Sequence, residues 1–156
     1  MKSLTLFRHA KSERDSESGR DFDRRLAERG QHDSRRMGEE IERLGLDFDL
    51  VLSSPAARAA ETAELAGLAP RYDQRIYDAS AGELLAIVQA TSDETNRLAM
   101  IGHNPGFERL ASRLVGQQID MPTGSLIEIG LPIGEWREAG SGSGQLVRFL
   151  KPKELV

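Results

Sequence analysis

The sequence contains no cysteine, and this absence excludes several kinds of protein at once. Without cysteine there is no disulfide scaffold, thiolate nucleophile, iron–sulfur cluster or sulfur-bound zinc. The sequence also lacks any apolar run near the roughly 18 residues that a membrane span requires. The short apolar stretch after Met1 is interrupted by Arg8 and His9, too early for the core of a signal peptide. We therefore expect a cytoplasmic protein without a membrane partner.

Aromatic residues (5%) are scarce, whereas charged residues make up 29% of the 156 residues. Lysine is scarce too, because 17 of the 21 basic residues are arginine. The arginine fork suits phosphate and carboxylate, although the same bias arises from GC-rich coding sequence. The net charge of −4 gives no reason to expect a nucleic-acid partner. The length fits one domain with its own core, so residues 1–156 are expected to form a single domain.

Short apolar segments alternate with amphipathic segments along the chain. The apolar segments predict strands at 4–7, 49–53, 97–101, 126–129 and 146–150. The amphipathic segments predict helices at 26–44, at 55 to about 66, and in the stretches after Ser80 and after Asn104. Strands that alternate with helices are typical of an α/β fold, so we expect a mainly parallel central sheet flanked by helices in three layers.

Two of these helices begin with the same device, a capping residue followed by proline. Ser54 precedes Pro55 and Asn104 precedes Pro105, which predicts that each proline occupies the first helical position. The free N–H groups of the first turn and the positive end of the helix dipole favour anions at both places.

Polar side chains follow three of the predicted strands directly. The first strand ends at Arg8 and His9, the second leads into a helix that carries Arg58, and the third ends at His103. Because the carboxyl ends of parallel strands meet at one sheet edge, these side chains are expected to form one pocket for a dianion such as phosphate. Taken singly, each of these side chains is more often an ordinary polar residue, solvated or paired with an acid at the surface.

Together, these residues carry a family resemblance that spans about residues 3 to 153. The matching segments, in chain order, are LFRHAKS, DRRLAERG, LVLSSPAARAAETAE, IGHNPG, MPTG and FLKPK. The sequence resembles the histidine phosphatase superfamily, and within it the SixA-type phosphohistidine phosphatases, the small form without a helical cap insertion. The resemblance implies a phosphoglycerate-mutase-like fold and no cofactor.

The resemblance also implies roles for individual residues. His9 would attack phosphorus and become transiently phosphorylated, while Arg8, Arg58 and His103 would hold the phosphoryl group. A neutral imidazole is a competent nucleophile when its other nitrogen is protonated and oriented. We expect His103 to be protonated when it assists an anion, and we add the backbone N–H of Asn104 as a phosphate contact because it lies at a helix start.

The general acid of the wider superfamily has no clear counterpart here. Its Glu or Asp would fall in the segment RIYDASAGELL, where Glu83 is occupied by a capping box with Ser80 and Asp78 is the freer candidate. Imidazole leaves a phosphoramidate more readily than an alkoxide leaves an ester, so it needs less help from an acid. The expected substrate is therefore phosphohistidine on a protein, such as a phosphorelay or phosphotransferase carrier.

Two other functions remain open. One is a phosphatase for small phosphomonoesters with Asp78 as acid, and the other is a phosphate- or protein-binding module without turnover. A mutase is disfavoured because the chain has no insertion that would enclose a sugar-acid substrate. The sequence does not determine the oligomeric state.

Several further features have simpler interpretations. The GSGSG run at 140–144 is predicted to be a turn, because no lysine or helix follows it. The arginines between Arg24 and Arg36 alternate with acidic residues, which predicts a solvated, self-paired face, although one of them could meet a protein substrate. Lys11 and Ser12 are candidates for the pocket mouth, and His32 is expected at the surface. Two histidines without clustered carboxylates predict no metal site.

Overall fold

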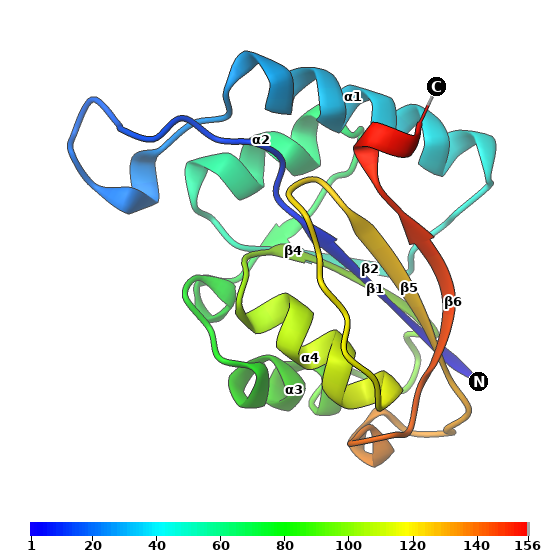
Figure 1. Cartoon of the computed structure of the whole chain (residues 1–156). Helices are drawn as coiled ribbons and strands as arrows, with labels where there is room; N and C mark the ends of the chain where they lie inside the picture. Colours follow the sequence, from blue (N-terminus) through cyan, green and yellow to red (C-terminus); the bar gives the residue numbers. More distant parts are fainter. Residues whose placement is uncertain (156) are drawn as a thin grey trace.

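The structure, a computed structural model, describes residues 1–155 and is built around one six-stranded sheet (Figure 1). The strands, in sheet order, are β3 (Arg71–Tyr72), β2 (Leu50–Ser53), β4 (Arg97–Gly102), β1 (Lys2–Arg8), β5 (Leu126–Leu131) and β6 (Gln145–Leu150). The first four run parallel, and β5 and β6 run antiparallel to their neighbours. The predicted α/β architecture with a mainly parallel sheet is confirmed.

Two helices cover each face of the sheet, as Figure 1 shows. The pair on one face is α1 (Glu28–Arg43) and α2 (Ala57–Leu65), and the pair on the other is α3 (Ala81–Gln89) and α4 (Gly106–Val115). Within residues 1–155, no helix is both long and apolar enough to span a bilayer.

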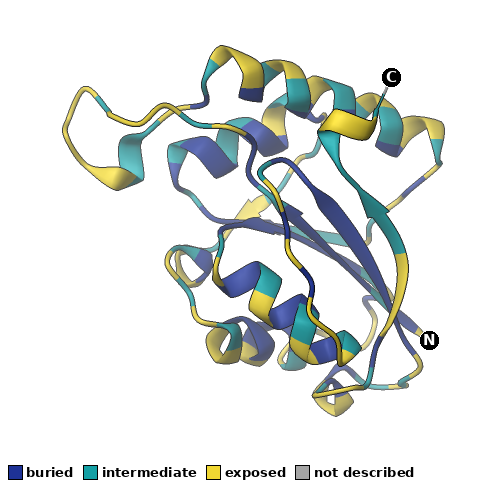
Figure 2. Cartoon of the chain, viewed as in Figure 1, coloured by how far each residue is buried: buried dark blue, intermediate teal, exposed yellow. Residues whose placement is uncertain are grey.

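Alternate residues of the central strands pack into two separate hydrophobic cores, because successive side chains of a strand point to opposite faces of the sheet. Leu6 and Met100 belong to the core beneath α3 and α4, whereas Phe7 and Ile101 belong to the core beneath α1 and α2. The central strands are buried along almost their whole length, whereas β6 is exposed at its start (Figure 2). The strand ends that carry polar residues are thus anchored from both sides.

The helix starts differ from the predicted positions. The segment from Ser54 to Ala56 is not helical, so α2 begins at Ala57, and Ser54 does not cap it. The prediction of a cap at Ser54 was therefore wrong, and its hydroxyl bonds a histidine instead. The second predicted cap is also displaced, because Pro105 occupies the cap position without a side-chain cap bond and α4 begins at Gly106. Asn104 lies one residue further out, where its side-chain oxygen accepts the backbone N–H of Glu108. Neither proline therefore occupies the first helical position.

The polar segment between β1 and α1 extends from the body of the protein as a loop (Figure 1). It contains one turn of 3-10 helix (Asp21–Asp23) and closes on itself through a bridge between Ser12 and Leu26. Gly30 of α1 packs against its base so tightly that a Cβ there would lie 2.0 Å from the carbonyl oxygen of Lys11. The loop therefore begins at a fixed point directly after the first candidate site residues.

Candidate active site

The register of the parallel strands places the two candidate histidines side by side. Arg8 of β1 pairs with Gly102 of β4, so His9 and His103 follow paired positions. Their ring centroids lie 5.2 Å apart with the planes inclined at 55°. Gly102 is required at this crowded strand end, because a Cβ would lie 2.7 Å from the ring of Phe107.

The histidines line one cavity of about 330 Å³. Its walls combine residues from the ends of β1 and β4, from α2, from the polar loop and from the segment before β5: Arg8, His9, Lys11, Ser12, Arg24, Arg58, His103, Asn104 and Thr123. The structure thus brings together the five residues predicted to hold phosphate. Four of the lining side chains are cationic and none of the described lining residues is acidic, so the cavity favours an anion.

His9 is held by its backbone and by its ring. Its N–H donates to the carbonyl of Gly102 at 3.0 Å, and its carbonyl accepts the N–H of Gly124 at 2.9 Å. Nδ1 of the ring lies 2.7 Å from the carbonyl oxygen of Ala10. A carbonyl can only accept, so Nδ1 carries the proton in this bond and Nε2 holds the lone pair.

Burial, and then the positive charges of Arg58, Arg8 and Arg24, lower the pKa of His9 to about 4. The ring is therefore neutral at neutral pH, the state in which Nε2 is a nucleophile.

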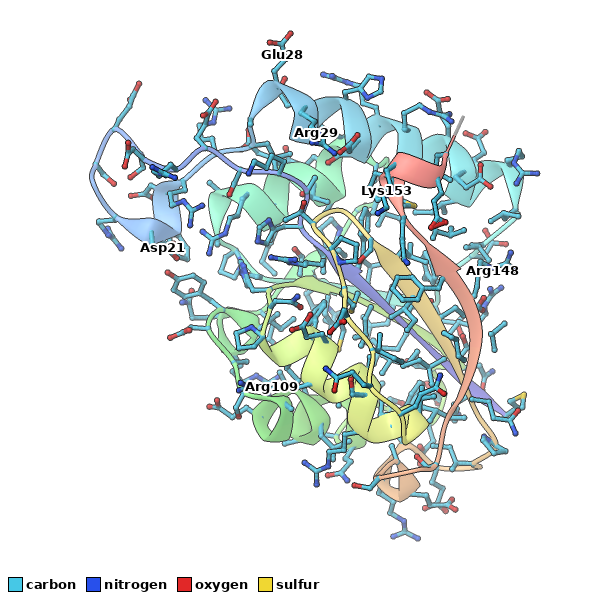
Figure 3. The ribbon with its side chains drawn as sticks, in the orientation of Figure 1. Asp21, Glu28, Arg29, Arg109, Arg148 and Lys153 are labelled. Carbon is cyan, nitrogen blue, oxygen red and sulfur yellow. The ribbon has the colours of Figure 1, made fainter. Side chains whose placement is uncertain are left out.

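Arg58 is buried, and both of its Nη groups bind one residue of the polar loop. Nη1 donates to the carbonyl of Asp21 at 2.8 Å and Nη2 donates to its carboxylate at 3.0 Å. The same carboxylate accepts the hydroxyl of Tyr77 and the guanidinium of Arg24. These hydrogen bonds, led by that from Tyr77, hold the pKa of Asp21 well below its usual range. Figure 3 shows Asp21 on the loop that projects from the body.

Arg8 and Asn104 are joined through the same backbone carbonyl. Arg8 Nη1 donates to the carbonyl of Met121 at 2.7 Å, and the side-chain amide of Asn104 donates to it at 2.9 Å and to Glu108 at 2.8 Å. Nε of Arg8 is buried and has no partner among residues 1–155. The side chain of Asn104 is committed to these bonds, which leaves its backbone N–H as the group that could meet a phosphate oxygen.

His103 is surrounded by positive charge and by buried neighbours. Burial, followed by the neighbouring His9 and Arg58, lowers its pKa to about 3, so the imidazole is neutral at neutral pH. Its Nε2 lies 2.7 Å from the hydroxyl of Ser54, while Nδ1 is buried without a partner in the described part of the chain. The ring of Tyr77 packs edge-on against it at 5.6 Å.

The candidate general acid lies outside the cavity lining. Asp78 is exposed and has a positive φ of 56°, directly after Tyr77. Glu83 forms the predicted capping box, because its carboxylate accepts the N–H of Ser80 while the serine hydroxyl accepts the N–H of Glu83.

Sequence reasoning missed the roles of Ser54, Asp21 and Tyr77. Asp21 and Tyr77 lie far apart in sequence and meet only through the folded loop, so no local motif could have revealed them. Arg24 was assigned to a self-paired face, and it does pair with Asp21 at 2.9 Å, but it also lines the cavity.

The remaining expectations concern features away from the cavity. His32 is exposed, and the run 140–144 is a turn that bonds the end of α4. In the part of the chain that the structure describes, no three histidine or acidic side chains gather as a metal site would require.

His9, His103 and Arg8 at the ends of parallel strands, together with Arg58 of α2, line one cavity whose positive charge suits an anion. The sequence profile of the histidine phosphatase superfamily (branch 1) matches residues 4–119, and the chain belongs to this superfamily. The Mycobacterium tuberculosis protein Rv1276c is 31% identical, in an alignment that covers 94% of this chain and 99% of the relative.

Solved structures extend the likeness. A protein from Agrobacterium tumefaciens, provisionally assigned as the phosphohistidine phosphatase SixA, has a TM-score of 0.83 at 26% identity over 97% of this chain and 98% of its own. The protein histidine phosphatase SixA complexed with tungstate has the same fold, with a TM-score of 0.84 at 22% identity over 99% of each chain. Family and fold together support phosphatase activity.

Proposed function

We propose that this protein is a phosphatase that forms a covalent phosphohistidine intermediate on His9 and removes phosphate from phosphohistidine in other proteins. The observation that carries the proposal is the bond between Nδ1 of His9 and the carbonyl of Ala10. It leaves the lone pair on Nε2 of a neutral ring, within a cavity that three arginines line. An oriented nucleophile beside fixed positive charge is what phosphoryl transfer requires.

The reaction has two balanced steps. In the first, the lone pair on Nε2 of His9 bonds to phosphorus while the bond from phosphorus to the substrate imidazole breaks. The departing imidazole takes up a proton from solvent water, since none of the described residues that line the cavity is an acid. In the second, water attacks phosphorus, the electrons of the nitrogen–phosphorus bond return to Nε2, and inorganic phosphate leaves. Neither step uses a metal ion or another cofactor.

The remaining site residues stabilise the charge that spreads over the phosphoryl oxygens in both steps. Arg8 and Arg58 supply charged donors, and His103 and the backbone N–H of Asn104 supply two further donors. Nε of Arg8, which is buried and has no partner in residues 1–155, is a donor that a phosphate oxygen would satisfy.

The preference for phosphohistidine is supported by the composition of the cavity wall. No described lining residue is a carboxylic acid, and the nearby Asp21 is kept ionised by its hydrogen bonds. An alkoxide leaving group would need such an acid, whereas imidazole needs less help. The SixA structure with tungstate, a tetrahedral oxyanion, agrees with an anion site in this fold.

The alternative activity toward small phosphomonoesters would use Asp78 as its acid. The observation that favours it is the position of Asp78 next to Tyr77, whose ring contacts His103. A binding module without turnover is the remaining alternative.

The test is phosphate release, in EDTA, from a phosphohistidine-bearing carrier protein and from p-nitrophenyl phosphate. We expect fast release from phosphohistidine, weak release from the ester, and no release by His9→Ala. His32→Ala is the matched control, because it removes an exposed histidine (74% exposed) far from the cavity lining. Faster turnover of the ester that depends on Asp78 would favour the alternative, and inactivity on both substrates would favour the binding module.

A further inference from the structure

Ser54 is a fully buried side chain that contacts the candidate site without lining its cavity. Its Oγ lies 2.7 Å from Nε2 of His103 and also accepts the backbone N–H of Ala56 at 3.2 Å. The backbone N–H of Ser54 donates to the carbonyl of Ile101 at 2.9 Å. The register of β2 and β4 therefore fixes the hydroxyl relative to the histidine ring.

The other hydrogen bonds of Ser54 indicate whether its hydroxyl or the ring of His103 donates the hydrogen in their contact. A hydroxyl has one hydrogen and two lone pairs, and the N–H of Ala56 occupies one of the lone pairs. Among the described residues, Nε2 of His103 is the acceptor found for the hydroxyl hydrogen. If Nε2 carried the proton instead, the hydroxyl hydrogen would be left buried and unpaired, which is unfavourable.

The donated hydroxyl places the proton of the neutral ring on Nδ1. Nδ1 is buried and has no partner within residues 1–155, although His103 belongs to the cavity wall. An Nδ1–H can donate to a phosphoryl oxygen without any uptake of a proton by the ring. The opposite tautomer would place a lone pair at Nδ1 and repel that oxygen.

We propose that Ser54 is a positioning residue, which fixes the tautomer and orientation of His103 so that Nδ1–H donates to the phosphoryl group. The inference rests on the proposed phosphatase function and assigns a role within the same site. A hydrogen bond on the far nitrogen of a histidine generally sets the tautomer that its working nitrogen presents. The sheet fixes this orientation, because the backbone N–H of Ser54 donates to the carbonyl of Ile101 on the neighbouring strand.

The test compares two neighbouring serines. Ser53 is equally buried, and its hydroxyl donates to the carbonyl of Ser54 at 2.9 Å without contacting His103. Ser54→Ala and Ser53→Ala therefore each remove one buried hydroxyl group. Only the hydroxyl of Ser54 contacts His103. Ser54→Thr keeps the hydroxyl.

Two readouts are needed: steady-state kinetics with the phosphohistidine protein, and nitrogen-15 NMR of the histidine tautomers, assigned with His103→Gln. We expect wild type to show His103 as the Nδ1–H tautomer. Ser54→Ala should show a tautomer mixture and a kcat/KM about tenfold lower. Ser53→Ala should keep the wild-type tautomer, and Ser54→Thr should restore it.

An Nε2–H tautomer in wild type, or an unchanged Nδ1–H tautomer in Ser54→Ala, would overturn the inference. The NMR result does not depend on turnover, so it separates this inference from the proposed function. A protein with the Nδ1–H tautomer but no phosphatase activity would contradict the proposed function alone. If Ser54→Ala does not fold, the wild-type spectrum and that of Ser54→Thr decide.

Discussion

Removing the carboxylate of Asp21 should strengthen phosphate binding rather than weaken it. Asp21 engages both Nη groups of Arg58, and Arg58 is a proposed phosphate ligand. A phosphate oxygen must therefore compete with this carboxylate for the same guanidinium. Asp21→Asn preserves the shape of the side chain and one acceptor oxygen but removes the competing charge.

The size of the expected gain in phosphate affinity follows from the solvent exposure of Asp21. The side chain of Asp21 is 49% exposed, so its ion pair with Arg58 is worth about 1 kcal/mol or less. Since 1.4 kcal/mol corresponds to about a factor of ten, Asp21→Asn should bind phosphate about fivefold more tightly. The backbone carbonyl of Asp21 still accepts Nη1, so the loop should keep its position.

The assay is product inhibition by inorganic phosphate, with isothermal titration as a check that does not require turnover. Asp23→Asn is the matched control, because Asp23 lies in the same turn and accepts the hydroxyl of Ser18, not Arg58. An inhibition constant that rises in Asp21→Asn, or falls equally in Asp23→Asn, would refute the competition.

Asp21→Asn should also change how the free energy of unfolding depends on pH. The pKa of Asp21 is lowered in the folded protein, so its contribution is present above the unfolded pKa of about 4 and is lost as pH falls through the folded value. The difference in free energy of unfolding between wild type and Asp21→Asn, from urea titrations, should therefore shrink between neutral pH and about pH 3. A difference that grows on acidification would contradict the assignment.

Three further predictions concern other parts of the site. Arg58→Ala should lower kcat/KM about a hundredfold, since two charge-assisted bonds of about 1.5 kcal/mol each are lost. Arg25→Ala should leave kcat/KM unchanged, because Arg25 is exposed and pairs with Glu61 of α2. In a pH profile, kcat/KM should fall only as pH drops through about 4, where His9 gains a proton; a fall near 6.5 would contradict its lowered pKa. Gly30→Ala should destabilise by about 3 kcal/mol in urea unfolding, because its Cβ would strike the backbone of the loop. Gly82→Ala should not destabilise, because a Cβ there would make only an ordinary contact with the hydroxyl of Ser80 at 3.9 Å.

The sequence sufficed to predict those parts of the fold and site that depend on local patterns. The strands that precede His9 and His103 are visible as apolar runs, and their parallel arrangement explains why the two rings meet. The register between β1 and β4, which sets their spacing, depends on packing in both cores. No local pattern encodes it.

The missing features depend on contacts between distant segments. Asp21 reaches Arg58 and Tyr77 only because the polar loop folds back over the site. Ser54 had the signature of a helix cap, but the neighbouring imidazole competes for its hydroxyl and the helix begins three residues later. The low pKa of His103 likewise arises from burial and from charges that only the folded chain assembles.

The central claim is that phosphate passes through His9. The most direct measurement is rapid quenching of the enzyme with a radiolabelled phosphohistidine protein, followed by peptide mapping of the labelled site. The account predicts an alkali-stable, acid-labile label on His9 in wild type and in His32→Ala, and none in His9→Ala. Phosphate release without any enzyme-bound label, or turnover that persists in His9→Ala, would contradict it.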